Sequence, residues 1–231
     1  HESGHALVLQ MVEKKEPLHK ITIIPRGTAY LGATMQLPEK DRYTESLIKL
    51  KGTLTGLMGG RVAEELVFGD ITTGAGNDLK QATHLARLMV CNWGMNNELG
   101  PQTFGAQEEL LFLGREVARN HDFSEDTSRR IDAEVNQLLR ESHHQASEIL
   151  SRNRDKLDLI ANLLIERETL DGRDVEEIVK HGRLLSEEER AKLETENGDN
   201  TAPAPSAEVA SKNSDTKRNN QECGEGCKNC E

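Results

Sequence analysis

The chain has 231 residues and a formal net charge of −11, from 29 basic and 40 acidic residues. Because phosphate binding needs a basic face, this balance argues against a nucleic-acid partner. No stretch approaches the roughly 18 consecutive apolar residues of a membrane-spanning helix, and the first residue is His, so we expect a fragment or processed product.

Hydrophobic residues make up 35% of the chain, fewer than in an ordinary globular protein, and the segment after residue 190 accounts for most of this difference. We therefore expect one folded domain over residues 1–185 and a disordered, acidic and polar tail over 186–231. Residues 1–15 read as a helix, and the β-branched runs at 21–25 and 30–36 predict a two-stranded ribbon. Apolar residues at helical spacing follow over 44–68, 77–93, 124–152, 154–167 and 172–181.

These patterns predict a mainly α fold, a helical bundle with a small two-stranded β-ribbon. Gly59-Gly60 interrupts the helical pattern of 44–68, either as a break or as a place where two helices approach closely. Cys91 falls inside a helical pattern and is interpreted as a small buried hydrophobe. The tail carries a cluster of Cys223, Cys227 and Cys230, interpreted as a flexible thiol patch able to bind a soft metal.

The chain opens with His1-Glu2-Ser3-Gly4-His5, an H-E-x-x-H motif. On a helix the two histidines lie on one face, so both imidazoles can reach one metal ion. The glutamate lies beside that ion, where it can take a proton from metal-bound water. A chain of this composition is expected to contain about 0.03 such motifs by chance, so the motif indicates a zinc hydrolase.

A tetrahedral zinc site that keeps one position open for water needs a third protein ligand. Glu64, Glu65 and Asp78 are the candidates. The first two lie on the predicted helix 44–68, whereas Asp78 opens the next helix after a glycine-rich loop. Spacing alone does not choose among them.

Several short segments occur in an order that is specific when they are taken together. They are His1-Glu2-Ser3-Gly4-His5-Ala6, Ile23-Ile24-Pro25-Arg26-Gly27, Gly59-Gly60-Arg61-Val62-Ala63-Glu64-Glu65 and Thr73-Gly74-Ala75-Gly76-Asn77-Asp78-Leu79. Shorter segments at Trp93-Gly94, Leu99-Gly100-Pro101 and Phe112-Leu113-Gly114-Arg115 extend the pattern. Over about residues 1–181 the chain closely resembles the peptidase domain of the FtsH family, membrane-anchored, ATP-dependent AAA+ zinc proteases.

The resemblance implies that residues 1–185 form a zinc metallopeptidase domain with one zinc ion per chain, held by His1, His5 and Asp78. It implies that Glu2 is the catalytic general base and that Glu64 orients a metal ligand through a hydrogen bond. An extended substrate would lie next to the zinc along Tyr30, Leu31, Gly32, Ala33 and Thr34.

The same resemblance implies a longer protein. An AAA+ domain upstream of His1 would bind ATP and Mg, and N-terminal segments absent here would make the only membrane contact. The peptidase domain would lie on the cytoplasmic side, or in the equivalent organelle compartment, of a homohexamer that degrades unfolded, misassembled or membrane proteins. Because helix ends without a preceding turn fray, we expect the isolated chain to bind zinc weakly.

Two other interpretations stay open. One is a stand-alone zinc peptidase that uses Glu64 rather than Asp78 as its third ligand. The other is a non-catalytic helical oligomerisation module with a structural metal site. The remaining histidines are interpreted as structural or solvated: His19, His84, His121, His143, His144 and His181.

Overall fold

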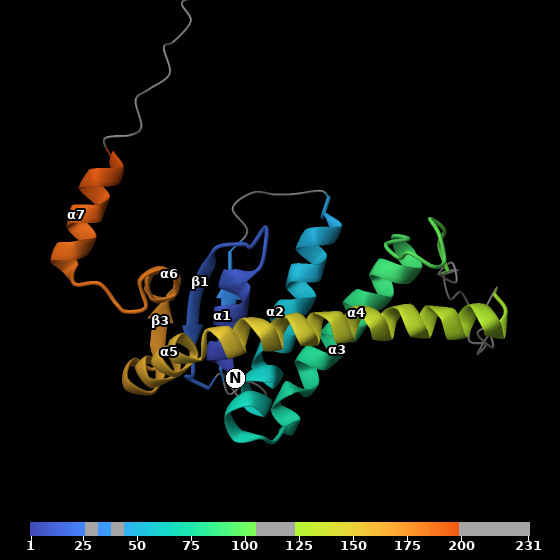
Figure 1. Cartoon of the computed structure of the whole chain (residues 1–231), viewed down its shortest axis with the longest axis horizontal. Helices are drawn as coiled ribbons and strands as arrows, with labels where there is room; N and C mark the ends of the chain where they lie inside the picture. Colours follow the sequence, from blue (N-terminus) through green and yellow to red (C-terminus); the bar gives the residue numbers. More distant parts are fainter. Residues whose placement is uncertain (26–31, 38–43, 105–122, 199–231) are drawn as a thin grey trace, which may run out of the picture. The chain divides into compact units, whose positions relative to one another are not determined.

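The computed structural model describes residues 1–25, 32–37, 44–104 and 123–198 (Figure 1). Contacts divide the chain into two parts, with the boundary between Leu185 and Ser186. No helix in the described ranges is both long enough and apolar enough to cross a membrane.

The first part is mainly helical with a small antiparallel sheet, which confirms the predicted fold class. Its elements are α1 (Glu2–Met11), β1 (Leu18–Thr22), β2 (Ala33–Gln36), α2 (Leu47–Phe68), the 3-10 turn η1 (Thr73–Ala75), α3 (Gly76–Arg87), the π turn η2 (Leu88–Asn92), α4 (Glu125–Arg152), α5 (Arg154–Arg167), β3 (Thr169–Asp171) and α6 (Gly172–His181).

The sheet has three strands in the order β2-β1-β3, not the two that the sequence predicts. Strand β3 is three residues long and lies between two helices, so it is too short to show an alternating pattern. Its Thr169 pairs with Thr22 of β1, and their hydroxyl groups are 2.8 Å apart. Strand β1 begins at Leu18 and ends at Thr22, earlier than the run 21–25 suggests.

Helix α2 runs unbroken through Gly59-Gly60, so the glycine pair marks a close approach of two helices. A Cβ atom added to Gly59 would lie 2.7 Å from the carbonyl oxygen of Gly4 on α1. The two helices meet backbone to backbone, and Leu7 of α1 and Leu54 of α2 are fully buried. This contact fixes the start of α1 against the middle of α2.

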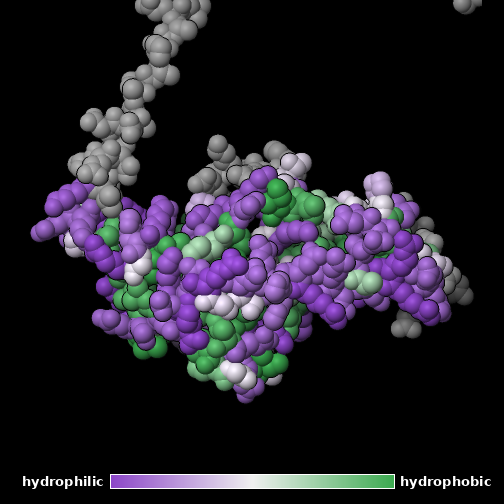
Figure 2. Space-filling view, in the orientation of Figure 1, coloured by the Kyte–Doolittle hydropathy of each residue, from purple (hydrophilic) through white to green (hydrophobic). Residues whose placement is uncertain are grey.

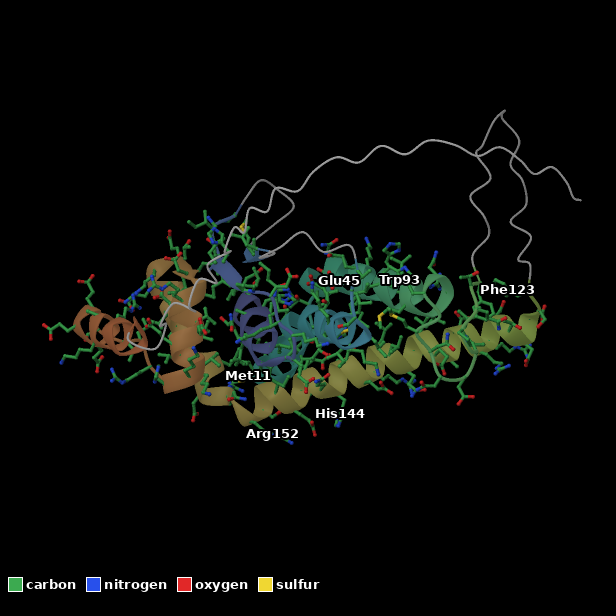
Figure 3. The ribbon with its side chains drawn as sticks, turned by 90° about the horizontal axis from the view of Figure 1, so that it is seen from above. Met11, Glu45, Trp93, Phe123, His144 and Arg152 are labelled. Atoms are coloured by element: carbon green, nitrogen blue, oxygen red, sulfur yellow. The ribbon has the colours of Figure 1, made fainter. Side chains whose placement is uncertain are left out.

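Helix α4 runs along one side of α1, α2 and α3 (Figure 1). Its hydrophobic stripe is buried at Ile131, Val135, Leu138, Ala146 and Leu150. The exposed side of this long helix is mainly hydrophilic (Figure 2). His144 and Arg152 project from it away from the neighbouring helices (Figure 3). This helix therefore forms one wall of the core.

The second part differs from the expected tail at its beginning, where the structure has a helix, α7 (Glu187–Gly198). The backbone amide of Ser186 donates to the side chain of Glu189, and the Glu189 amide donates back to the Ser186 hydroxyl. This reciprocal pair is a capping box, which starts a helix even in a polar segment. Residues 199–231, with the three clustered cysteines, lie outside the described residues.

Candidate metal centre and active site

Three side chains meet where the first turn of α1 faces α2 and α3. Nε2 of His1 is 3.1 Å from Nε2 of His5 and 3.2 Å from Oδ2 of Asp78. Nε2 of His5 is 3.5 Å from the same Asp78 oxygen. Among the described residues, His1, His5 and Asp78 form the group of ligand-type side chains that could hold a metal ion.

The opposite ring nitrogens of the two histidines are held by α2. Nδ1 of His5 is 2.8 Å from the carbonyl oxygen of Gly56, which can only accept, so this nitrogen donates its proton. Nδ1 of His1 is 2.8 Å from Oε1 of Glu64 and donates in the same way. When the rings are neutral, both Nε2 atoms therefore present lone pairs toward Asp78, as metal-ligating histidines do.

Glu64 is itself held in place by the loop after α2. Its Oε2 accepts hydrogen bonds from the amide and the hydroxyl of Thr72, both 3.0 Å long. Glu65, the other candidate ligand on α2, points elsewhere and binds Arg61 and His143, each at 2.9 Å. The structure thus brings Asp78 and Glu64 to the histidines and leaves Glu65 out.

The two carboxylates of this site are ionised. Burial raises the pKa of Asp78, but hydrogen bonds with His1 and His5 outweigh this effect and hold that pKa well below its usual range. Burial likewise raises the pKa of Glu64, and hydrogen bonds from Thr72 and His1 bring it below its ordinary value. The hydrogen bond with Asp78 raises the pKa of His1, against the opposing effect of burial. Two fixed negative charges therefore favour a cation here.

The three ligand atoms fit a zinc ion. Tetrahedral geometry with metal–ligand bonds of about 2.0–2.1 Å places neighbouring ligand atoms about 3.3 Å apart. The three separations here are 3.1, 3.2 and 3.5 Å. Gly60 of α2 makes this approach possible, because a Cβ atom there would lie 2.5 Å from Nε2 of His5 and 2.6 Å from Cε1 of His1.

Glu2 lies beside this cluster and faces strand β2. Its Oε2 accepts a hydrogen bond of 2.7 Å from the hydroxyl of Thr34. A Cβ atom at Gly32 would lie 2.8 Å from both Cγ and Oε1 of Glu2. Of the expected substrate strand, Gly32, Ala33 and Thr34 are described, while Tyr30 and Leu31 lie outside the described residues.

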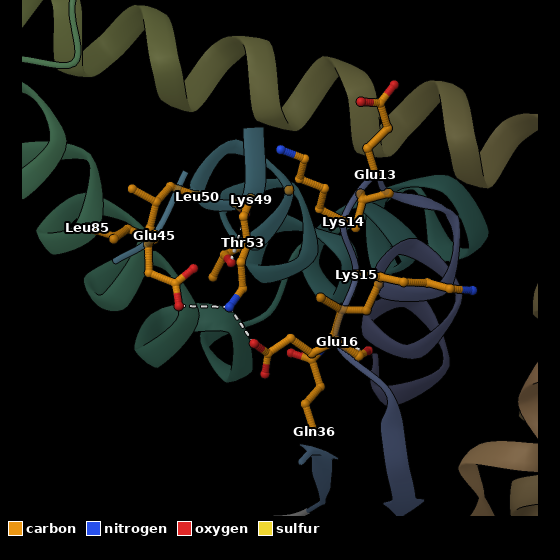
Figure 4. Close-up of a pocket in the computed structure, with 13 residues that line it drawn as sticks. Glu13, Lys14, Lys15, Glu16, Gln36, Glu45, Lys49, Leu50, Thr53 and Leu85 are labelled. Carbon is orange, nitrogen blue, oxygen red and sulfur yellow. Dashed lines mark hydrogen bonds and ion pairs between the residues drawn. The ribbon is translucent and has the colours of Figure 1, made fainter. Parts of the chain in front are cut away.

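A cavity of about 510 Å³ lies elsewhere, between the end of α1, strand β2 and the start of α2 (Figure 4). Its lining includes Lys14, Lys15 and Lys49 but none of the three metal-ligand candidates. Lys49 donates to Glu16 and, at 2.7 Å, to Glu45, so its charge is compensated. This cavity is separate from the metal cluster.

Other expected residues take no part in the site. His19, His84, His144 and His181 are exposed, and His121 lies outside the described residues. Cys91 is half-buried in the π turn rather than fully buried. Sequence reasoning did not identify Gly56 and Thr72 as partners of His5 and Glu64, because neither a backbone carbonyl nor a loop threonine has a recognisable pattern.

Comparison with known proteins adds family evidence to this geometry. The family model described as Peptidase family M41 matches residues 1–178. The chain is 51% identical over 180 residues to the ATP-dependent zinc metalloprotease FtsH of Acidobacterium capsulatum, covering 78% of this chain and 28% of that protein. It is 46% identical over 188 residues to the protein of the same name from Thermotoga maritima, covering 81% and 30%.

A third relative, ATP-dependent zinc metalloprotease FtsH 4 of Sorangium cellulosum, is 51% identical over 192 residues, covering 82% of this chain and 29% of its own length. The chain thus spans less than a third of the length of these relatives. The family match covers the H-E-x-x-H segment and α3, which supply the three converging side chains, and α2, which packs against both helices. This chain belongs to peptidase family M41, the family of the FtsH zinc metalloproteases.

Proposed function

We propose that this chain hydrolyses peptide bonds at a zinc site formed by His1, His5 and Asp78. The observation that carries the proposal is the convergence of their three ligand atoms at separations of 3.1–3.5 Å. Glu2, which carries the carboxylate, follows His1 directly in the sequence. The names of the relatives, which are zinc metalloproteases, support the choice of metal.

Each side chain has one task in this proposal. His1, His5 and Asp78 would hold a zinc ion, which would supply a Lewis acid for the scissile carbonyl and for a water molecule. Glu2 accepts a proton from the attacking water and passes it to the leaving amine. Glu64 orients the imidazole of His1, and the carbonyl of Gly56 does the same for His5.

The substrate is proposed to bind in an extended conformation along β2. In the described part of the sheet β2 pairs only with β1, so its other edge has no strand partner. A peptide added there would form main-chain hydrogen bonds, which every sequence offers, and this suits a protease with many protein substrates. Glu2 contacts Thr34 of this strand, so the added peptide would run past the general base.

We infer that the complete protein is longer. The relatives are named ATP-dependent and are more than three times as long as the part that this chain matches. The remaining length is proposed to carry an AAA+ ATPase that binds ATP and Mg, and a membrane anchor. A homohexamer that degrades unfolded, misassembled or membrane proteins is proposed on the same ground.

The first experiment measures zinc content after dialysis, and casein cleavage, in the complete protein and in its Glu2→Gln variant. We expect one zinc ion per chain in both, and cleavage lost by about a hundredfold or more only in the variant, because the general base is removed while the ligands stay. Zinc bound without cleavage by either protein would instead favour an oligomerisation module with a structural metal.

A second pair of variants tests the third ligand. Asp78→Asn is expected to lose zinc on dialysis, because an amide oxygen is a poor ligand for zinc beside two histidines. Glu64→Gln should keep zinc with reduced affinity, because it changes only the partner of Nδ1 of His1. The reverse order of zinc loss would favour Glu64 as the ligand.

A further inference from the structure

We propose that Thr34 is a positioning residue that holds the general base Glu2 through its hydroxyl group. The inference rests on the proposed function, in which Glu2 is the base. It gives β2 a second role in the reaction, separate from substrate binding.

The contact is short and comes from a different element. The Thr34 hydroxyl is 2.7 Å from Oε2 of Glu2 and 3.4 Å from the backbone oxygen of the same residue. A hydroxyl has one proton to donate, and the shorter contact to the carboxylate is the better hydrogen bond. Within the described residues, no other side chain donates to the Glu2 carboxylate, so this bond is its anchor.

The backbone of Gly32 packs against the Glu2 side chain. A Cβ atom there would lie 2.8 Å from Cγ and Oε1 of Glu2 and 2.9 Å from the backbone oxygen of Thr22. Glu2 therefore lies against the strand backbone at Gly32 and is tied by its far oxygen to Thr34. The second oxygen, Oε1, receives no hydrogen bond from the described residues and is available to accept a proton.

A glutamate side chain has three rotatable bonds, and nothing in the H-E-x-x-H spacing orients it. The spacing places the histidines on one face of α1, whereas Glu2 points off that face toward β2. General-base catalysis requires hydrogen-bond reach to the attacking water, so a base that samples several rotamers is productive for only part of the time. Removing the anchor should therefore lower turnover without changing zinc or substrate binding.

The test compares Thr34→Val and Thr34→Ser with the wild type in the complete zinc-loaded protein. Valine keeps the β-branched shape and removes the hydroxyl, whereas serine keeps the hydroxyl. Thr169→Val is the matched control, because Thr169 lies in the same sheet, bonds the Thr22 hydroxyl and does not touch Glu2. The readouts are kcat and KM for an internally quenched peptide, zinc content after dialysis, thermal unfolding and a crystal structure of Thr34→Val.

We expect Thr34→Val to lower kcat about tenfold, with KM and zinc content changed less than about twofold and with Glu2 in more than one rotamer. Thr34→Ser should recover kcat to within about twofold of the wild type, because the donor is restored. Thr169→Val should lower only the unfolding temperature.

A kcat of Thr34→Val equal to that of the wild type, or Thr34→Ser as slow as Thr34→Val, would overturn the proposal. A similar fall in kcat for Thr169→Val would assign the effect to the sheet as a whole and also overturn it. These failures are distinct from failure of the proposed function. The proposed function fails instead if Glu2→Gln cleaves as well as the wild type, or if neither protein cleaves.

Discussion

Replacing Gly60 with alanine is expected to weaken zinc binding about tenfold or more, although residue 60 is not a ligand. Gly60 lies on α2 directly beneath the two imidazoles. A Cβ atom there would be 2.5 Å from Nε2 of His5, 2.6 Å from Cε1 of His1 and 2.7 Å from Nε2 of His1. Those two Nε2 atoms are two of the three proposed zinc-binding atoms.

The required displacement follows from these distances. An ordinary van der Waals contact of a Cβ atom begins at 3.4 Å, so the His5 ring must retreat by about 0.9 Å. Metal sites hold their bond lengths within about 0.2 Å, so such a movement breaks the ligand set. Helix α1 cannot move away from α2 instead, because its Leu7 is fully buried and its Gly4 already touches Gly59 of α2. Strain of about 1–3 kcal/mol should therefore accompany the loss of zinc.

The assay is competition for zinc against a chromophoric chelator, together with chemical unfolding of the metal-free protein. Gly52→Ala is the matched control on the same helix, since its nearest neighbours lie at 3.4 Å. It should bind zinc like the wild type and gain up to about 1 kcal/mol of stability from the better helix former. If Gly60→Ala held zinc as tightly as Gly52→Ala, the idea that the bare backbone at residue 60 makes room for the histidines would be wrong.

Three further predictions concern the support of the site and the core. Thr72→Val removes one of the two hydrogen bonds that Thr72 donates to Glu64. It should weaken zinc binding up to about tenfold in the same competition assay, and unchanged affinity would contradict this prediction. Leu54→Ala leaves a cavity at a fully buried position and should lower the free energy of unfolding by about 2–5 kcal/mol, measured by urea unfolding. A decrease below about 1 kcal/mol would refute this prediction. The hydrogen bond to Glu16, followed by that to Glu45, raises the pKa of Lys49 above its ordinary value of 10.5. These ion pairs therefore stabilise the folded protein below that pH, and the stabilisation disappears as the pH rises through the raised pKa. Lys49→Met should therefore cost about 1 kcal/mol at about pH 8 and progressively less as the pH rises above the ordinary pKa of lysine, whereas a cost independent of pH would rule out the ion pair as its cause.

Helix α4 was predictable because it buries one continuous hydrophobic stripe. The apolar spacing over 124–152 agrees with α4 (Glu125–Arg152), and Ser124 caps it by accepting a hydrogen bond from the amide of Thr127. Strand β3 was not predictable, because three residues show no period and its formation depends on the distant partner β1. Helix α7 differs from the expected tail for another reason: the composition of this segment predicts disorder, whereas the capping pair of Ser186 and Glu189 starts a helix.

The sequence by itself determined the helical class, the pairing of His1 with His5 on one helix face, and the family to which the chain is similar. Those properties depend on local periodicity and on the order of short segments. Only the tertiary structure decided that Asp78 rather than Glu65 reaches the histidines, that Gly60 makes room for them, and that Thr34 holds Glu2. Each of these contacts joins residues more than 30 positions apart, and their meeting depends on how α1 packs on α2 and β2, which no local pattern encodes.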